Sequence, residues 1–177
     1  MVRETVLTPN DLVLPLFAVP GRRVTEPVTS MPGVFRQSAD AMLATVETAA
    51  KAGVPAVLLF GIPAHKDAKG SNAWDEKGPA PATVREIKKR FPDLVVMTDV
   101  CLCAYTNHGH CGVLHGKRID NDATLDGLGR MALCHARAGA DFVAPSDMMD
   151  GRVGHLRAAL DKAGFVETGI LSYAVKY

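Results

Sequence analysis

Runs of apolar residues with the length of β-strands alternate with amphipathic helical patterns along this chain, and that alternation limits its fold more than any other feature. Five runs are expected to form strands: residues 12–19, 56–62, 94–102, 141–145 and 169–176. Four helices are expected between them, on apolar faces that include Val46, Ile87, Leu128 and Leu156. Unbroken strand–helix alternation is typical of a parallel sheet with helical crossovers.

The expected helices carry signals at both ends. Residues 38–40 predict the start of the first helix, and Asn121 or Asp122 predicts the cap of the third, because short polar side chains accept hydrogen bonds from a first turn. Glycine commonly follows a last turn because it adopts the left-handed conformation at little cost. Three helices are expected to end at Gly53, Gly139 and Gly164.

The number of strand–helix units bears on the fold class. No glycine-rich dinucleotide fingerprint follows the first strand, which disfavours a nucleotide-binding doubly wound sheet. A TIM (β/α)8 barrel has eight units in about 250 residues. The 177 residues of this chain hold about five strands and four helices. We therefore expect one α/β domain over residues 1–177, either an incomplete barrel or a shorter open sheet.

The composition disfavours several classes of partner. A formal net charge of +1 provides no basic field for nucleic acid, and the longest apolar runs have strand length, too short to span a membrane. The first residues contain no apolar signal-peptide core, so a cytoplasmic location is expected. In that compartment the four cysteines favour metal binding or catalysis over disulfides.

Three of the cysteines form the strongest chemical signal, a C-x-C-x7-C pattern where a buried strand runs into a His- and Gly-rich loop. Alternation along the strand predicts that Asp99, Cys101 and Cys103 share one side, and the loop can fold back to bring Cys111 beside them. Three thiolates make a tetrahedral zinc site with one open position, which a catalytic zinc requires.

Two other interpretations of these cysteines stay open. Cysteine is among the most buried residue types, so two of the three can be core residues, as Cys134 on a helix is expected to be. A closed structural zinc site, with His108 or His110 as the fourth ligand, is the second alternative.

A second signal lies in residues 144–153, at the carboxyl end of the fourth expected strand. Barrel enzymes carry their chemistry at this end of the strands. Ser146 and Asp147 are candidates for positioning a polar substrate. The alternative is a helix cap, which we prefer for Asp150.

The third signal is Lys176, which ends the last apolar run. A lysine in a barrel mouth is partly desolvated, and desolvation lowers the pKa of the ammonium group and makes the amine a nucleophile for carbonyls. Judged on local sequence alone, a solvated terminal lysine is the preferred interpretation, since most lysines are exposed.

Taken together, these segments resemble the zinc-dependent porphobilinogen synthase family, also called 5-aminolaevulinate dehydratase. The matches occur in order along nearly the whole chain, and the DVCLC…HGHCG and APSDMMDGRV stretches are highly specific. The matching blocks are residues 14–17, 30–34, 60–63, 66–67 with 70–71, 99–112, 144–153, and 172–173 with 176.

The resemblance implies a TIM barrel that condenses two molecules of 5-aminolaevulinate into porphobilinogen with loss of two waters, in tetrapyrrole and haem biosynthesis. It implies that Lys176 is the first of two Schiff-base lysines and that Asp99 and Ser146 lie near the zinc and the substrate. It further implies that Zn2+ is held by Cys101, Cys103 and Cys111, with His110 in support. A homo-oligomer is expected as well, while the cytoplasmic location and the lack of nucleic-acid or membrane partners are expected from the composition.

The family pattern also leaves parts unmatched. The second Schiff-base lysine and the carboxylate-binding residues of later strands are expected beyond Tyr177, and the long N-terminal arm of the family is absent or reduced. The 177-residue chain alone is therefore expected to be impaired in catalysis. The alternative function is a truncated, non-catalytic paralogue that binds zinc or a pathway intermediate.

Overall fold

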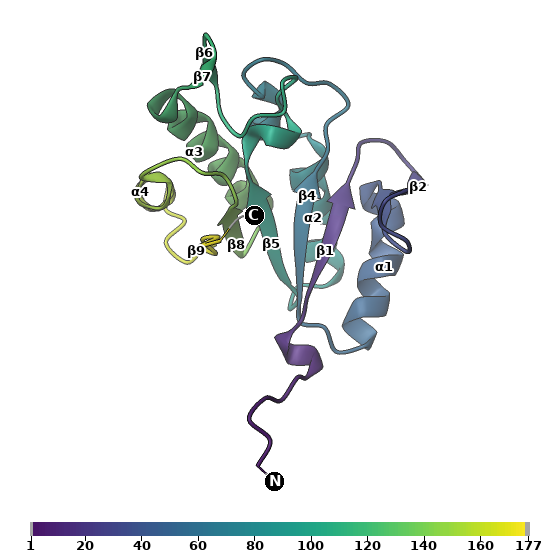
Figure 1. The fold of residues 1–177 in the computed structure, drawn as a ribbon. Helices are drawn as coiled ribbons and strands as arrows, with labels where there is room; N and C mark the ends of the chain where they lie inside the picture. The colour runs from purple at the N-terminus through teal and green to yellow at the C-terminus, as the bar shows by residue number, and fades with distance from the viewer. Residues whose placement is uncertain (1, 176–177) are drawn as a thin grey trace.

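The computed structural model describes residues 2–175, which form a mostly parallel sheet with helices packed against one face (Figure 1). The strand order in the seven-stranded sheet is β2-β3-β1-β4-β5-β8-β9. Its parallel strands are β1 (Val13–Ala18), β4 (Ala56–Gly61), β5 (Val95–Val100), β8 (Phe142–Pro145) and β9 (Gly169–Ile170). The helices are α1 (Ala39–Lys51), α2 (Pro79–Arg90), α3 (Asn121–Ala138) and α4 (Arg152–Lys162).

All five expected strands are present in the expected order, and the fifth is much shorter than predicted. Strand β9 contains two residues, whereas the apolar run predicted a strand over 169–176. The chain beyond β9 still follows β8, because the backbone N–H groups of Leu171 and Tyr173 donate to the carbonyls of Val143 and Pro145, at 3.0 and 3.3 Å. Lys176 lies outside the described residues.

Four short strands were not expected. Strand β2 (Thr25–Pro27) lies inside a segment predicted as loop and pairs antiparallel with β3 (Phe35–Gln37), which continues the sheet beyond β1. Strands β6 (Leu114–His115) and β7 (Arg118–Ile119) form a separate hairpin. Strands of two or three residues are too short to produce an alternating pattern, which explains why the sequence does not reveal them.

The helix ends agree with the prediction except at three caps, those of α1 and α3 and, at the candidate site, that of α4. Asp120, one residue earlier than predicted, caps α3: its carboxylate accepts from the Ala123 N–H at 3.0 Å. Ser38 precedes α1 as predicted, but its hydroxyl accepts from the Val24 N–H at 3.0 Å and makes no cap hydrogen bond. All three predicted glycines adopt positive φ just after a helix.

The two faces of the sheet differ. Leu16, Val57, Leu59 and Val96 point toward the helices and form a buried core with α1 and α2. The alternate residues point to the opposite face, where register pairs them side by side and leaves them half-buried. These residues are Phe17, Leu58, Phe60, Met97 and Phe142. This second face leads to the candidate site. None of the described helices is long and apolar enough to cross a membrane.

His135 on α3 is fully buried, and neither of its ring nitrogens has a hydrogen-bond partner. Burial lowers the pKa of this imidazole to about 4. In the unfolded chain the His135 imidazole is protonated below about pH 6.5, whereas in the folded chain it stays neutral until about pH 4. We expect the free energy of unfolding to fall as pH drops through this window, by about 1.4 kcal/mol per pH unit at the steepest point.

Urea unfolding between pH 7 and pH 4 measures this effect. His135→Leu should flatten the pH dependence, whereas His115→Leu, at an exposed histidine of the β6–β7 hairpin, should leave it in place. An unchanged slope in His135→Leu would show that other groups cause the acid sensitivity.

Candidate metal centre and adjoining pocket

The carboxyl ends of β5 and β8 lie side by side and bring two polar side chains together. Asp99 is paired in register with Ala144, two residues before Ser146. The Ser146 hydroxyl donates a hydrogen bond to Asp99 Oδ1, and both residues are only 8% exposed. The two strands are joined by α3, so this contact links residues 47 positions apart. The two residues that the resemblance places near the metal and the substrate are therefore in contact with each other.

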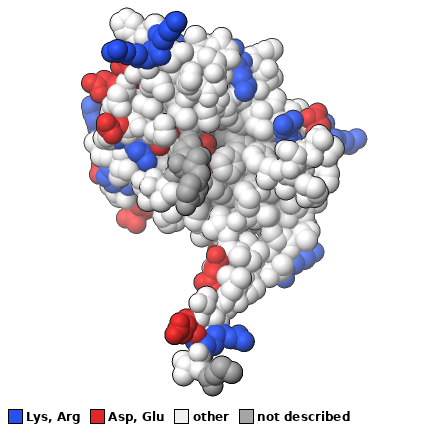
Figure 2. All heavy atoms as spheres, in the orientation of Figure 1, with Lys and Arg blue, Asp and Glu red and all other residues white. Residues whose placement is uncertain are grey.

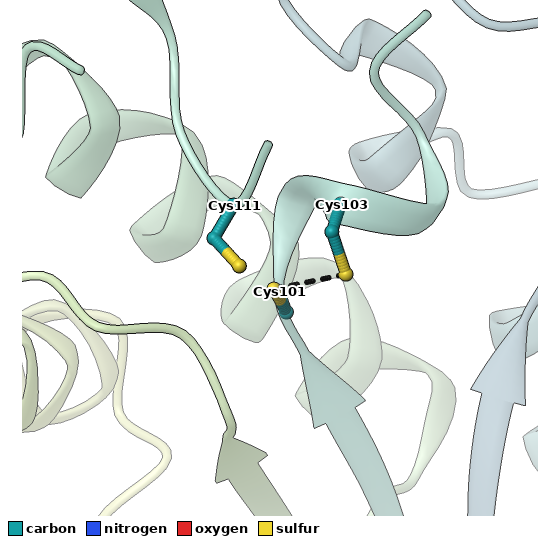
Figure 3. Close-up of side chains that lie close together, drawn as sticks. All are labelled: Cys101, Cys103 and Cys111. Carbon is teal, nitrogen blue, oxygen red and sulfur yellow. Dashed lines mark hydrogen bonds between the residues drawn. The ribbon is translucent and has the colours of Figure 1, made fainter. Parts of the chain in front are cut away.

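Three thiols converge just beyond this pair, as Figure 3 shows. Cys101 follows the last residue of β5, Cys103 lies on the 3-10 turn η3 (Leu102–Ala104), and Cys111 comes from the following loop. Their sulfur atoms all lie within 4.8 Å of one another, and the Cys101 thiol donates to Cys103 Sγ at 3.3 Å. The prediction that the loop returns Cys111 to the other two agrees with this arrangement.

The route by which Cys103 reaches the cluster differs from the prediction. Alternation along a strand that ran to residue 102 was expected to put Asp99, Cys101 and Cys103 on one side, but β5 ends at Val100. The backbone then turns into η3, and this turn brings Cys103 back over Cys101. The reason is local: residues 102–104 form a helical turn in which the Tyr105 N–H donates to the Leu102 carbonyl at 2.8 Å.

The donor set suits a metal ion. Tetrahedral coordination with metal–sulfur bonds of about 2.3 Å separates the sulfurs by roughly 3.8 Å, a spacing consistent with this cluster. Without a cation, the hydrogen bond to Cys103 and burial both raise the pKa of the Cys101 thiol. Cys134 is the contrasting case: it is a single buried cysteine on α3, and burial raises its pKa to about 11.

Two histidines stand near the cluster but outside it. The group of possible metal ligands found in residues 2–175 holds the three cysteines and no histidine. His108 Nε2 lies 3.2 Å from the Ala68 carbonyl, and His108 Nδ1 accepts from the His110 N–H at 3.2 Å. This arrangement favours an open fourth position over a closed site with a histidine ligand.

A cavity of about 600 Å³ adjoins Cys103 of the thiol cluster and the Asp99–Ser146 pair. Its walls combine the carboxyl ends of the strands with the loops that follow them. On the face seen in Figure 2, apart from the residues drawn in grey, charged side chains of both signs lie mostly toward the edges. The described lining residues are Phe17, Arg36, Phe60, Gly61, Ile62, Lys66, Asp99, Cys103, Ala104, Ser146, Tyr173 and Val175.

The loop after β8 fastens the end of the described chain to the site. Asp147 does not line the cavity: its carboxylate accepts from the Met149 N–H at 2.8 Å and lies 3.6 Å from Arg152 Nε. Arg152 also donates to the Tyr173 carbonyl at 3.1 Å. The preferred interpretation of Asp150 as a helix cap is wrong, because Gly151 occupies the N-cap of α4.

Sequence reasoning did not single out Arg36, Lys66, Arg152 or Tyr173 as site residues, although the last three lie in stretches that resemble the family. Arg36 lies on a three-residue strand, and Arg152 lies in the first turn of a helix. Strand β3 has only three residues, too few for an alternating pattern to reveal it. The candidate nucleophile Lys176 lies outside the described residues.

Comparison with known proteins gives a consistent picture. The family model for delta-aminolevulinic acid dehydratase matches residues 1–177. The chain is 53% identical over 176 residues to the delta-aminolevulinic acid dehydratase of Ruminiclostridium josui, covering 99% of this chain and 86% of that protein. It is 50% identical to the protein of the same name from Halalkalibacterium halodurans, covering this whole chain but 54% of that protein. The chain thus spans about half the length of the second relative.

A solved structure extends the comparison to the fold. The delta-aminolevulinic acid dehydratase (porphobilinogen synthase) of Toxoplasma gondii, crystallised with its reaction product porphobilinogen, matches with a TM-score of 0.96 at 38% identity. The match covers 99% of this chain and 51% of that one. That protein is a TIM barrel, so the predicted fold class, a TIM-barrel family member with part of the barrel, is confirmed.

The thiol cluster leads to a prediction about metal content. We expect one metal ion per chain, and Cys103→Ala should lose most of it because two thiolates hold a tetrahedral ion far less firmly than three. Cys134→Ala, at the cysteine outside the cluster, is the matched control and should retain the metal. Elemental analysis after gel filtration measures this, and equal metal in wild type and Cys103→Ala would contradict it.

Proposed function

Because this chain belongs to the delta-aminolevulinic acid dehydratase family, we propose that it carries the first part of a porphobilinogen synthase site. The proposed reaction condenses two molecules of 5-aminolaevulinate into porphobilinogen with loss of two waters. The observation that carries this proposal is a cavity lined by Asp99, Ser146 and Cys103, the last of which belongs to the cluster of three thiols. Carbonyl chemistry between two amino-keto acids needs such a set: an anion for an ammonium group, a hydroxyl donor and an electrophile.

Asp99 and Ser146 are proposed to hold the substrate beside the thiols. Asp99 is the one carboxylate among the described lining residues, so it attracts a substrate ammonium group. The Ser146 hydroxyl, which donates to Asp99 Oδ1, fixes the direction of the carboxylate. A proton released from the substrate ammonium group can be held at this carboxylate, since both groups are almost excluded from water.

Lys176 is proposed as the amine that forms a Schiff base with one substrate. It lies outside the described residues, and the support comes from its neighbours. Tyr173 and Val175 line the cavity, and the Arg152 hydrogen bond to the Tyr173 carbonyl holds this segment against the β8 loop. An iminium on such a lysine is a stronger electron sink than the ketone it replaces.

Zn2+ is the metal we propose for the cysteine cluster, because three thiolates with an open position suit catalytic zinc. When bound by Cys101, Cys103 and Cys111, it would act as a Lewis acid toward a substrate oxygen or amine. A homo-oligomeric, cytoplasmic protein remains a prediction. A zinc- or intermediate-binding paralogue is the alternative function, and the cavity lined by Asp99 and Ser146 favours the enzyme over it.

Borohydride reduction in the presence of 5-aminolaevulinate tests the proposal. If Lys176 acts as proposed, reduction should attach substrate to this residue far more than to the other lysines, since a desolvated amine has a lower pKa and reacts as the free base. Peptide mass spectrometry locates the label, and Lys176→Arg should remove it. Label spread evenly over surface lysines, with Lys176 no richer than Lys162, would contradict the role of Lys176.

A further inference from the structure

We propose that Arg152 is a positioning residue that holds the backbone leading to Lys176 at the edge of the cavity. This inference rests on the proposed function, because it concerns the amine that forms the Schiff base. Arg152 is the first residue of α4 and is not among the described residues that line the cavity. It acts on the site through Tyr173, which lines the cavity and precedes Lys176 by three residues in the sequence.

The segment after β9 is held by hydrogen bonds more than by packing. Leu171 and Val175 are exposed, and Tyr173 between them is only half-buried. Within residues 2–175, Tyr173 is the last residue whose backbone bonds to β8, through its N–H and the Pro145 carbonyl at 3.3 Å. The carbonyl of the same tyrosine accepts from Arg152 Nη2 at 3.1 Å. Tyr173 is therefore the point at which the described chain is fixed before Lys176.

Arg152 joins two loops because its guanidinium donates in two directions. Nη1 donates to the Met149 carbonyl in the loop after β8, at 3.2 Å, and Nη2 donates to the Tyr173 carbonyl. A planar guanidinium carries several N–H donors in a fixed arrangement, so it can hold two carbonyls in one geometry. Hydrogen bonds from a charged donor are also stronger than those between neutral groups. The Arg152 side chain therefore sets the distance between the β8 loop and the segment of Tyr173.

Asp147 directs the guanidinium toward these carbonyls. Its Oδ2 lies 3.6 Å from Arg152 Nε, and both atoms are buried. The other carboxylate oxygen accepts from the Met149 N–H at 2.8 Å, which fixes the orientation of the carboxylate. A buried carboxylate needs a compensating cation, so Asp147 and Arg152 keep each other in place. This counter-ion role differs from the direct substrate contact that the sequence suggested for Asp147.

The loop after β8 thereby couples two parts of the proposed site. Ser146 donates to Asp99 in the cavity, and the next residue, Asp147, pairs with Arg152. The polar pair and the segment of Tyr173 are thus attached to the same short stretch of backbone. Attack of an amine on a bound carbonyl depends steeply on geometry, and a misplacement of about 1 Å can slow a reaction roughly a hundredfold.

Arg157 on the same helix provides a matched comparison. It also binds two carbonyls, those of Phe165 and Thr168, at 2.8 and 2.6 Å, and it pairs with Asp161 at 2.6 Å. These carbonyls precede β9, at the opposite end of that strand from Tyr173. Arg157 therefore stabilises the fold by the same kind of contact without touching the segment that leads to Lys176.

Borohydride trapping of 5-aminolaevulinate on the zinc-loaded chain, followed over time, tests the role of Arg152. Peptide mass spectrometry compares the label on Lys176 with that on Lys162. We expect Arg152→Gln to slow labelling of Lys176 roughly tenfold, because the Tyr173 carbonyl loses its charged donor. Arg152→Lys should fall between wild type and Arg152→Gln, since an ammonium group keeps the charge opposite Asp147 but cannot hold both carbonyls.

Arg157→Gln is the control: it should melt at a lower temperature, as Arg152→Gln should, but label Lys176 at the wild-type rate. Circular dichroism and zinc content check each variant, and Arg152→Lys decides if Arg152→Gln does not fold. A wild-type rate in the deciding variant, or an equal loss in Arg157→Gln, would overturn the inference and leave the proposed function standing. No preferential labelling of Lys176 in zinc-loaded wild type would overturn the proposed function, and this inference with it.

Discussion

The register between β5 and β8 is the constraint on which the rest of the site depends. It pairs Asp99 with Ala144 and so sets Ser146 against the Asp99 carboxylate. Parallel strands end at the same edge of a sheet, and the residues that leave them must share the space above it. A slip of β5 by one residue would turn Asp99 toward the helices and separate it from Ser146. The alignment puts the Asp99–Ser146 pair at the strand edge from which the chain continues into the cysteine cluster.

Burial of Cys101 and Asp99 determines how easily these two groups carry a charge. Cys101 is fully buried, and its thiol is costly to ionise because both the hydrogen bond to Cys103 and the loss of water favour the protonated form. A divalent cation reverses this preference, since it stabilises thiolates directly. The neighbouring Asp99 carboxylate is likewise almost excluded from water. The proposed site therefore concentrates charge where the dielectric is low and where a small zwitterionic substrate would be strongly oriented.

The sequence predicts the parallel sheet, because long apolar runs leave clear patterns. It names Asp99 and Ser146 as site residues through the resemblance, but the hydrogen bond between them appears only in the structure. It predicts the convergence of the cysteines but not the turn that brings Cys103 to them, since three residues carry too little periodicity. Arg36 and Lys66 escape notice for a different reason: their significance depends on a cavity formed by segments far apart in the sequence. Arg152 is similar, because its contact with Tyr173 joins two loops.

The central claim is that three thiols on this strand edge hold a metal and leave one position for chemistry. X-ray absorption spectroscopy of the zinc-loaded chain at the zinc edge tests it directly. The account predicts three sulfur neighbours at about 2.3 Å and one lighter oxygen or nitrogen neighbour that is exchanged when 5-aminolaevulinate is added. A spectrum with an imidazole in the fourth position, unchanged by substrate, would show a closed structural site and contradict the claim.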